Sequence, residues 1–438
     1  AHASEQSFAA PLAQWPADDW WSAYGDAQLD RLIAEGLAGA PTIAVAAARL
    51  AHAEAYAQVA GAATRPQISA NASAQSQKQS YNYMTPRAAT PQGWQEYGRA
   101  TLDFSWDLDF WGKNRAALAA ATSDAEAVRA DLAQARIMLA TSIATAYAEF
   151  ARLHAALDTA RAALEVRSRT AQLFGERHGQ GLETLGSLRQ VEARRASAAA
   201  DLLAVEEQLA LQKNRIAALV GAGPDRGLSL TRPQLELARE LALPERLAAD
   251  LLGRRPDVTA ARLRAQSAAR RIDQAEAAFY PNINLLAFIG SQALGLNLLF
   301  AGGSSIGSVG AAISLPIFDG SRLRGQLRGA DADYAEAVAN YNGVVVQALQ
   351  EVADAAASKR ALGDQLARTG ESVAASRAAW DIQNRRYQGG LATYLDVLSA
   401  EDTLLGTLRV QSDLRSRAFS LDVALVRALG GGYRSTLS

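Results

Sequence analysis

The stretch from Tyr97 to Phe110 most constrains the fold, because its polar and apolar residues alternate along its whole length. One face carries Gly98, Ala100, Leu102, Phe104, Trp106, Leu108 and Phe110, and the other carries Arg99, Thr101, Asp103, Ser105, Asp107 and Asp109. A period of two is typical of a β-strand that has an apolar medium on one side and water on the other. The length also fits the roughly 9–11 residues that a tilted strand needs to cross a bilayer. Taken alone, the pattern favours a strand of an ordinary β-sandwich. Other features of the chain are needed to distinguish such a strand from one that crosses a membrane.

Aromatic residues lie near both ends of this strand. Trp94 and Tyr97 are at one end, and Trp106, Phe110 and Trp111 are at the other. Such a distribution is typical of strands that meet both surfaces of a membrane. No run of about 18 apolar residues occurs that would form a membrane-spanning helix. A membrane-embedded form of this chain would therefore have to cross as a closed barrel.

A unit of helix, proline and strand occurs twice in the chain. Helical patterns run from Pro41 to Pro66 and from Pro256 to Pro281, and both intervals are 25 residues. Alternation begins after each second proline, with Ile68, Ala70, Ala72 and Ala74 in the first unit and Ile283, Leu285, Ala287 and Ile289 in the second. Proline disfavours the α conformation in the residue before it, so a helix ends there. The sequence thus predicts an internal two-fold repeat with one β-hairpin in each half.

Long helical patterns follow each predicted hairpin. Apolar residues recur every seven positions, as Ala125, Leu132, Leu139, Ala146, Leu153 and Ala160 in the first half and as Val338, Val345, Val352, Leu366, Val373, Trp380 and Tyr387 in the second. Roughly 60 residues without proline predict a rod of about 90 Å. The rods end at Gly179-Gln180-Gly181 and at Gly389-Gly390, and second helices then return over 184–220 and 393–429.

We expect five segments along the chain. They are an N-terminal segment (1–40), a first repeat (41–220, hairpin at about 66–110), a linker (221–255), a second repeat (256–430, hairpin at about 281–318) and a tail (431–438). The linker is expected to pack beside the N-terminal segment. Ala1-His2-Ala3 resembles the end of a cleaved secretory signal.

Composition excludes several classes of function. The net charge is −1, and the arginines are spread among acids, so no nucleic-acid partner is predicted. The chain has no cysteine, and its four histidines have no metal-ligand spacing. Gly303-Ser304-Ser305-Ile306-Gly307 matches the G-x-S-x-G pattern, but no histidine follows it as that hydrolase fold requires. We therefore predict no enzyme, and no catalytic, cofactor or metal site.

The predicted strands are too few to close a membrane barrel within one chain. Each chain supplies four, whereas the smallest known barrels need about eight, and an open edge in lipid would leave backbone groups unpaired. Several chains would then share one barrel, which continues outside the membrane as a ring of helices. The predicted fold class is mostly α with a small β part. A soluble coiled-coil scaffold is the alternative, but it explains neither the paired hairpins nor the aromatic rims.

The chain resembles the outer-membrane efflux protein family, the TolC-like channels, and most closely the OprM- or NodT-like branch of RND drug-efflux outer-membrane factors. The resemblance rests on the doubled units and on four motifs, Arg254-Arg255-Pro256-Asp257-Val258, Leu315-Pro316-Ile317-Phe318-Asp319-Gly320, Arg386-Tyr387-Gln388-Gly389-Gly390 and Tyr394-Leu395-Asp396-Val397-Leu398. It implies a homotrimer with a shared 12-stranded β-barrel in outer-membrane lipid and a long α-helical barrel through the periplasm. Residues 1–40 would then be a periplasmic or equatorial segment, and residues 221–255 a linker or equatorial segment. It also implies efflux of drugs or other small molecules with a periplasmic adaptor and an inner-membrane RND-type transporter. A type I secretion exit duct is the alternative.

The resemblance also implies roles for particular residues. The periplasmic gate would involve Asp396, Tyr387 and Ser399, and the adaptor would dock at Gly179, Gly181, Gly389, Gly390, Thr184 and Thr393. Arg99, Thr101, Asp103, Ser105 and Asp107 would face the lumen. Three copies of Asp396 around an axis would raise one another's pKa and attract cations. The first-half counterpart of Asp396 is Ser187, so the ring would come from the second half alone.

This chain departs from its relatives in two respects. Some relatives hold an arginine and a second aspartate where this chain has Ala392 and Ser399. Many begin with a lipid-bearing cysteine, and lipidation of the natural protein therefore stays an open expectation.

Overall fold

The computed structural model describes residues 15–82, 84, 86–235 and 253–434. Ala1-His2-Ala3, part of the expected linker and the last four residues of the expected tail lie outside the described residues. The chain forms two compact units. A helical unit comprises Ala1–Ala48, Ala130–Thr259 and Asn342–Ser438, and a sheet unit comprises Arg49–Arg129 and Ala260–Tyr341.

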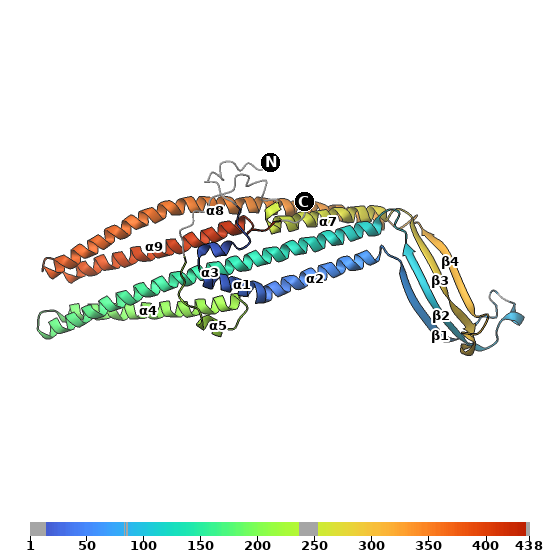
Figure 1. Cartoon of the computed structure of the whole chain (residues 1–438), viewed down its shortest axis with the longest axis horizontal. Coiled ribbons are helices and arrows are strands. Elements are labelled where there is room, and N and C mark those ends of the chain that lie inside the picture. Colours follow the sequence, from blue (N-terminus) through green and yellow to red (C-terminus); the bar gives the residue numbers. More distant parts are fainter. Residues whose placement is uncertain (1–14, 83, 85, 236–252, 435–438) are drawn as a thin grey trace. The chain divides into compact units, whose positions relative to one another are not determined.

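The sheet unit contains one four-stranded antiparallel sheet in the order β1-β2-β3-β4 (Figure 1). Its strands are β1 (Gln67–Lys78), β2 (Trp94–Asp107), β3 (Asn282–Leu294) and β4 (Ser305–Ser314). Both predicted hairpins are present, and β2 pairs with β3 so that the two hairpins form one sheet. The register places Ala70, Leu102, Ile289 and Gly307 in one row across the sheet. The apolar sides of the strands therefore coincide.

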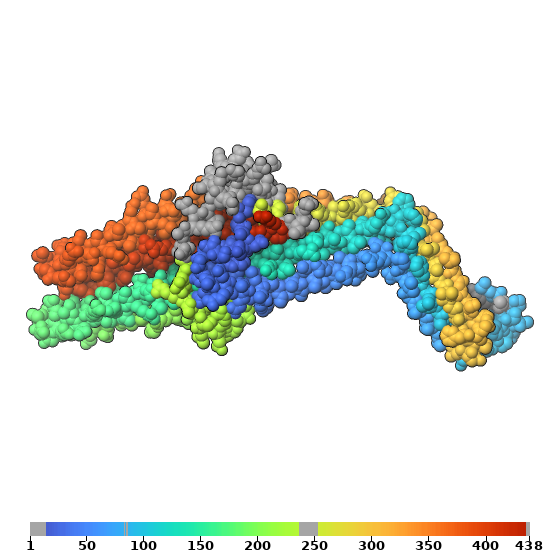
Figure 2. Space-filling view, in the orientation of Figure 1, coloured from blue at the N-terminus to red at the C-terminus, as the bar shows by residue number. Residues whose placement is uncertain are grey.

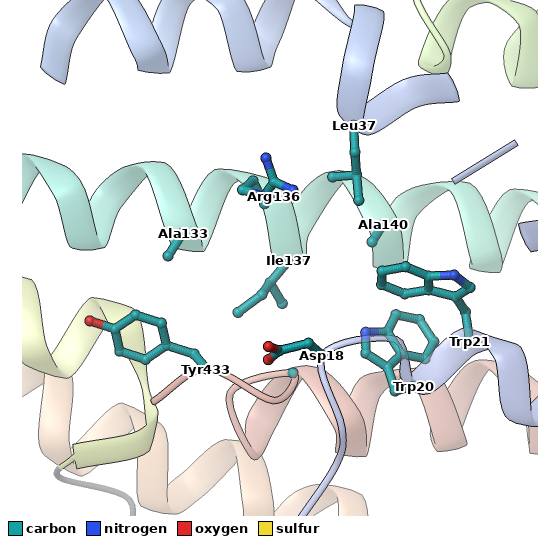
Figure 3. Close-up of a pocket in the computed structure, with 10 residues that line it drawn as sticks. Asp18, Trp20, Trp21, Leu37, Ala133, Arg136, Ile137, Ala140 and Tyr433 are labelled. Atoms are coloured by element: carbon teal, nitrogen blue, oxygen red, sulfur yellow. The ribbon is translucent and has the colours of Figure 1, made fainter. Parts of the chain in front are cut away.

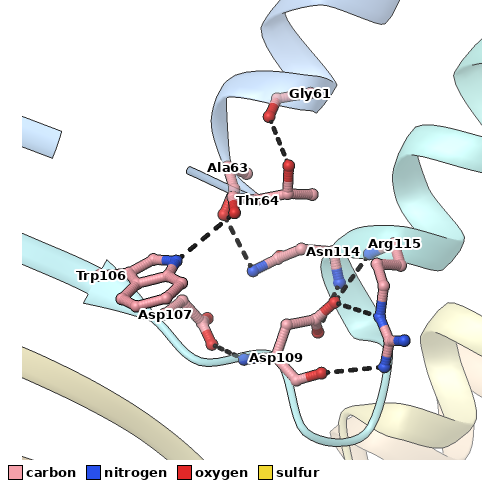
Figure 4. A network of polar contacts seen from close by, with 8 residues as sticks. All are labelled: Gly61, Ala63, Thr64, Trp106, Asp107, Asp109, Asn114 and Arg115. Carbon is pink, nitrogen blue, oxygen red and sulfur yellow. Dashed lines mark hydrogen bonds and ion pairs between the residues drawn. The ribbon is translucent and has the colours of Figure 1, made fainter. Parts of the chain in front are cut away.

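Strand β2 ends earlier than the alternation predicts, because Asp109 is a turn residue. Its backbone has φ 41°, and its carboxylate accepts hydrogen bonds from the N–H groups of Asn114 (3.0 Å) and Arg115 (2.9 Å) (Figure 4). The aspartate thus satisfies free N–H groups in the first turn of the following helix. Leu108 to Phe110 accordingly lie outside the strand, and this part of the prediction is wrong.

The helical hairpins of the two halves have equal lengths (Figure 1). Helices α3 (Lys113–Gly179) and α8 (Arg322–Gln388) each have 67 residues, and their return helices α4 (Leu185–Leu219) and α9 (Tyr394–Ala428) each have 35. Each boundary of α8 and α9 follows its counterpart in α3 and α4 by 209 residues, since 322 − 113 and 428 − 219 give the same value. The repeat is therefore exact in its helical hairpins.

The helices that precede the two β-hairpins begin where the sequence predicts. Helices α2 (Pro41–Ala62) and α7 (Pro256–Ala277) both start at proline, which suits the first helical position because its missing N–H is unpaired there in any case. The others are η1 (Trp20–Tyr24), α1 (Ala27–Gly39), η2 (Arg87–Ala89), α5 (Asp225–Leu228) and η3 (Leu296–Leu298). No single helix in the described residues has the length and apolarity to cross a membrane, and the one bent pair that meets the criterion together is α1 with α2.

The N-terminal segment packs on α3 through a buried core. Trp20, Leu29 and Tyr147 are all at most 5% exposed. The buried carboxylate of Asp26 accepts hydrogen bonds from Tyr147 Oη and from the backbone N–H of Gln234, both at 2.8 Å. One acidic side chain thus joins the N-terminal segment, α3 and the segment after α5.

A cavity of about 250 Å³ lies where the N-terminal segment and the C-terminal residues meet α3 (Figure 3). Trp20 and Trp21 line one side, Ile137 projects into it from α3, and Tyr433 lines the other side. Gly431 packs directly on Ile137, since a Cβ at this glycine would lie 3.1 Å from the isoleucine side chain. The cavity is part of this packing junction.

In the helical unit, the end of each repeat packs against the start of the same repeat. A Cβ on Gly221, after α4, would lie 2.8 Å from the carbonyl oxygen of Gly39, just before α2. A Cβ on Gly430, after α9, would lie 1.9 Å from the carbonyl oxygen of Arg254, just before α7. Both glycines have positive φ, so neither position accepts a side chain.

Candidate functional site

The predicted adaptor-docking residues form two turns of the same geometry. Gly181 and Gly390 have φ of 74° and 71°. In the first turn the N–H of Leu182 donates to the carbonyl of Arg177 (2.9 Å), and in the second the N–H of Leu391 donates to the carbonyl of Arg386 (2.8 Å). Together with the bonds from Gly181 to His178 and from Gly390 to Tyr387, this is the Schellman ending of a helix.

Both turns present an exposed leucine to the surroundings. Leu182 is 64% exposed and Leu391 is 74% exposed, and the two positions are counterparts in the repeat. Gly179 and Gly389 precede the turning glycines, and a Cβ at Gly179 or Gly181 would meet no atom within 4 Å. The turns therefore combine a fixed backbone with an uncrowded apolar surface.

The threonines after the turns cap the return helices. Thr184 Oγ1 accepts from the N–H of Ser187 (3.1 Å), and its hydroxyl lies 2.9 Å from Ser187 Oγ. In the second half the carboxylate of Asp396 accepts from the N–H (2.9 Å) and the hydroxyl (2.8 Å) of Thr393. The first-turn residue reaches back to the cap in both halves, but only the second half uses a charged group.

The predicted gate residue Asp396 is exposed in the single chain. The hydroxyl and then the N–H of Thr393 hold the pKa of the Asp396 carboxyl below its usual range. The carboxylate is thus ionised at neutral pH. It is free to interact with other charges through the oxygen that Thr393 does not use.

Tyr387, the second predicted gate residue, contacts the first helical hairpin through a hydrogen bond and its own hairpin through an aromatic contact. Its hydroxyl accepts from Arg177 Nη1 of α3 at 3.5 Å, and its ring lies 5.3 Å from that of Tyr394 in an edge-to-face arrangement. Tyr394 donates to Thr170 Oγ1 of α3 at 2.6 Å and packs on Phe174. Helices α8 and α9 are therefore joined to α3 beside the two turns.

A group of charged side chains makes a second contact between the hairpins. The carboxylate of Asp402 on α9 accepts from Arg167 of α3 and from Arg194 of α4, both at 2.7 Å. Next to it Glu401 lies 3.8 Å from Arg167, and its side chain is only 7% exposed. Burial raises the pKa of the Glu401 carboxyl, and Arg167 counteracts this only in part. Figure 2 shows the two hairpins in green and in orange to red.

Sequence reasoning missed these charged residues, although a signal was present. Arg167 occupies the next heptad position after Ala160, and Glu401 lies on the apolar stripe of Val397 and Leu404. A charge within an apolar stripe marks a buried ion pair or a polar contact. Ser399, the third predicted gate residue, is exposed, and the contact described for it is its carbonyl accepting from Thr403 Oγ1.

The predicted lumen-facing residues of β2 share one side of the sheet. Asp103 accepts from Asn71 Nδ2 and from Thr101 Oγ1, both at 2.8 Å. Arg99 lies over the ring of Phe288 on the neighbouring strand, 5.1 Å from its centre. Ser105 is exposed, Thr101 is 6% exposed, and Asp107 accepts from the N–H of Asp109 in the following turn. On β2 this side is therefore polar, although its partners on β3 include Leu286 and Phe288.

The opposite side of the sheet is apolar and exposed in the single chain. Its large residues are between 54% and 77% exposed, namely Ile68, Leu102, Ile289, Val309 and Ile313. A contiguous exposed apolar surface of this kind marks contact with lipid or with another protein.

The serine of the G-x-S-x-G match has no catalytic surroundings. Ser305 is the first residue of β4 and pairs with Ser291 of β3. The hydrolase pattern requires a sharp turn between a strand and a helix at this serine, and here the chain continues as a strand.

The comparisons with known proteins agree with these observations. The family model described as "Outer membrane efflux protein" matches residues 32–222 and 247–431, one segment for each repeat. The solved structure of the outer membrane protein VceC from Vibrio cholerae is 50% identical, with a TM-score of 0.89 over 96% of this chain and 100% of that one.

Two relatives extend the comparison. The multidrug resistance outer membrane protein MdtQ of Escherichia coli O157:H7 is 32% identical over 96% of this chain and 89% of its own length. The fusaric acid resistance protein FusA of Burkholderia cepacia is 40% identical over 73% of this chain, and the match spans 61% of FusA. The chain therefore belongs to the outer membrane efflux protein family, as its sequence predicts.

Proposed function

We propose that three copies of this chain form the outer-membrane exit duct of a tripartite efflux pump. The four-stranded sheets of three chains close one 12-stranded barrel, and the apolar side of each sheet contacts lipid. The helical hairpins form a duct through the periplasm. Drugs or other small molecules enter it from an inner-membrane RND-type transporter through a periplasmic adaptor.

The observation that carries this proposal is the pair of equivalent turns with exposed leucines. A trimer would present six such turns around its axis, alternately from the first and the second half. Leu182 and Leu391 of the three chains then form a ring of six apolar side chains with near six-fold spacing, which a coaxial partner can contact. Exposed apolar residues on a fixed backbone are typical of protein docking surfaces.

The contacts between the hairpins are proposed to hold the duct closed. Opening moves α8 and α9 away from α3 and α4, and this separates Tyr394 from Thr170 and Asp402 from Arg167 and Arg194. The side chains of Arg194 and Asp402 are 31% and 46% exposed, so their ion pair contributes little stability by itself. Several weak contacts that break together suit a gate that the adaptor opens by binding.

Asp396 is proposed to line the narrowest part of the closed duct. Its carboxylate is ionised and exposed, and three copies near the axis would attract cations. Adaptor docking and lining of the duct are thus assigned to different residues. The leucines of the turns contact the adaptor, and Asp396 contacts the permeating molecule.

Adaptor binding tests the proposal directly. Leu182→Asp with Leu391→Asp should abolish binding of the purified cognate adaptor in surface plasmon resonance and abolish drug efflux in cells, while the amount of trimer in the outer membrane stays unchanged. Leu203→Asp on α4 is a matched control, because this leucine is 66% exposed but lies away from the turns. Normal adaptor binding by the double variant would refute docking at the turns.

A further inference from the structure

We propose that the loop between β3 and β4, residues 295–304, binds lipid by inserting its side chains among the acyl chains of the membrane. The inference rests on the proposed function in one respect, that the sheet lies in a bilayer. It adds a separate contact, because loops that join membrane strands ordinarily face water.

The composition of the second hairpin sets this loop apart. No Asp, Glu, Lys, Arg or His occurs between residues 277 and 318. Within the loop, Phe300 is 82% exposed, Leu298 is 48% exposed and Leu296 is 43% exposed. Large apolar side chains gathered on one exposed segment mark a contact with lipid or protein.

The position of the loop identifies lipid as the partner. Gly98 of β2 stands opposite Ala74 and Ala293, on the same side of the sheet as Leu102. A Cβ at Gly98 would lie 2.9 Å from Leu296 Cδ2 and 3.4 Å from Leu299 Cδ1. The loop therefore folds over the apolar side of the sheet and not over the polar side. Leu296 and Leu299 thus lie on the side of the sheet that carries Leu102 and Ile289.

The loop backbone can enter an apolar medium because much of it is hydrogen-bonded internally. The N–H of Leu298 donates to Gly295, that of Ala301 donates to Leu298, and that of Ser304 donates to Ala301. The hydroxyl of Ser304 donates to the carbonyl of Leu298 at 2.7 Å, and the N–H of Gly295 donates to the carbonyl of Glu96 on β2 at 2.7 Å. Unpaired backbone groups would otherwise make insertion unfavourable.

The loop between β1 and β2 provides an internal contrast at the same end of the sheet. Lys78 and Arg87 lie 5.5 and 5.6 Å from the ring centre of Tyr81, whose hydroxyl accepts from the N–H of Gly93. Charged and polar groups of this kind favour water or lipid headgroups. One hairpin loop is therefore suited to the aqueous boundary and the other to the acyl chains.

Site-directed spin labelling tests the inference, and the absence of native cysteine makes the labelling specific. Phe300→Cys, Leu102→Cys and Asn82→Cys are labelled separately with a nitroxide in the full chain, and the proteins are reconstituted as trimers into phosphatidylcholine–phosphatidylglycerol vesicles. Collision rates are measured with oxygen, which concentrates in lipid, and with a water-soluble nickel chelate. We expect the label at residue 300 to favour oxygen, like that at 102, and the label at 82 to favour the chelate.

Two other outcomes would each overturn a different statement. If the label at 300 favours the chelate while that at 102 favours oxygen, the sheet is in lipid and the loop inference is wrong. If the label at 102 also favours the chelate in a protein that fractionates with the vesicles, the membrane placement of the sheet in the proposed function is wrong. Leu298→Cys gives a second reading should the label at 300 impair reconstitution.

Discussion

The helical hairpins and the β-hairpins of this protein repeat to different degrees. In the helical hairpins the 209-residue offset holds at every boundary, and the two turns share their hydrogen bonds. In the β-hairpins the first half carries charges such as Arg99 and Asp103, whereas the second has none from 277 to 318. The two halves thus keep the same geometry where they form equivalent turns and diverge where they face different surroundings.

The same comparison applies to single residues at equivalent positions. Glu192 and Glu401 are counterparts, yet Glu192 pairs with Arg189 at the surface, and its side chain is 37% exposed against 7% for Glu401. Residue type therefore does not fix the role of a repeated position. Whether the side chain at such a position is buried or exposed depends on the helix that packs against it.

The largest effect is expected from arginine on the apolar side of either hairpin. Leu102→Arg and Ile289→Arg should each lower the amount of assembled trimer strongly, because arginine at a lipid-facing site near the bilayer centre costs about 2–4 kcal/mol. Heat-resistant trimer on a denaturing gel measures the effect. Ser105→Arg on the polar side is the control and should assemble normally. A harmless Ile289→Arg beside a harmful Leu102→Arg would mean that the two hairpins do not share one apolar side.

A smaller effect is expected at the turning glycines. Gly181→Val and Gly390→Val should each destabilise their turn by roughly 1–2 kcal/mol, because both positions have positive φ that a β-branched residue adopts poorly. Efflux should fall in both variants while the trimer remains in the membrane. Loss of the trimer itself would show that the turns serve folding alone, and unequal losses would break their equivalence.

The contribution of the buried Glu401 to stability should depend on pH. Because the folded-state pKa of Glu401 is raised, its contribution to stability is fully present below the usual glutamate pKa and is lost as pH rises through the folded value. Glu401→Gln should therefore remove part of the destabilisation seen on raising the pH from 4 to 7, measured as thermal unfolding of the trimer. Glu192→Gln is the control for removing a glutamate charge at the equivalent position. An identical pH profile for wild type and Glu401→Gln would contradict the assignment.

The smallest effect on stability is expected from exchanging the first-turn residue that reaches back to the cap. Asp396→Ser copies Ser187 of the first half and removes the charge, so stability should change by less than about 1 kcal/mol. Cation preference and block by multivalent cations should weaken in single-channel recordings of this variant. Asp396→Asn should behave in the same way if the charge is responsible. Unchanged selectivity in both variants would remove Asp396 from the pore.

Much of the fold was predictable because its signals are local. Prolines at 41 and 256, glycines at 181 and 390, and the alternation in β2 each act on the backbone within a few residues. The extra length predicted for β2 has the same origin, since Asp109 continues the alternation in sequence but turns to hold the N–H groups of Asn114 and Arg115.

The candidate site was less predictable because its contacts join distant segments. Tyr387 and Asp396 follow from a family motif. The contacts between the hairpins join Arg177 to Tyr387, Thr170 to Tyr394 and Arg167 to Asp402, and each pair is separated by more than 200 residues. Heptad spacing indicates which face of a helix is buried but not which helix covers it. The pairing of Arg167 with Asp402 therefore required the structure.

The closure of each repeat on itself bears on how such a chain can arise. Gly221 touches the residues before α2, and Gly430 touches the residues before α7, so the two ends of each repeat are neighbours in space. A gene segment encoding one such unit can be copied in tandem without stretching the polypeptide, because the next copy begins where the previous one ends. New termini opened in a loop that joins two strands would leave the helical hairpins intact. This protein is therefore a suitable subject for circular permutation.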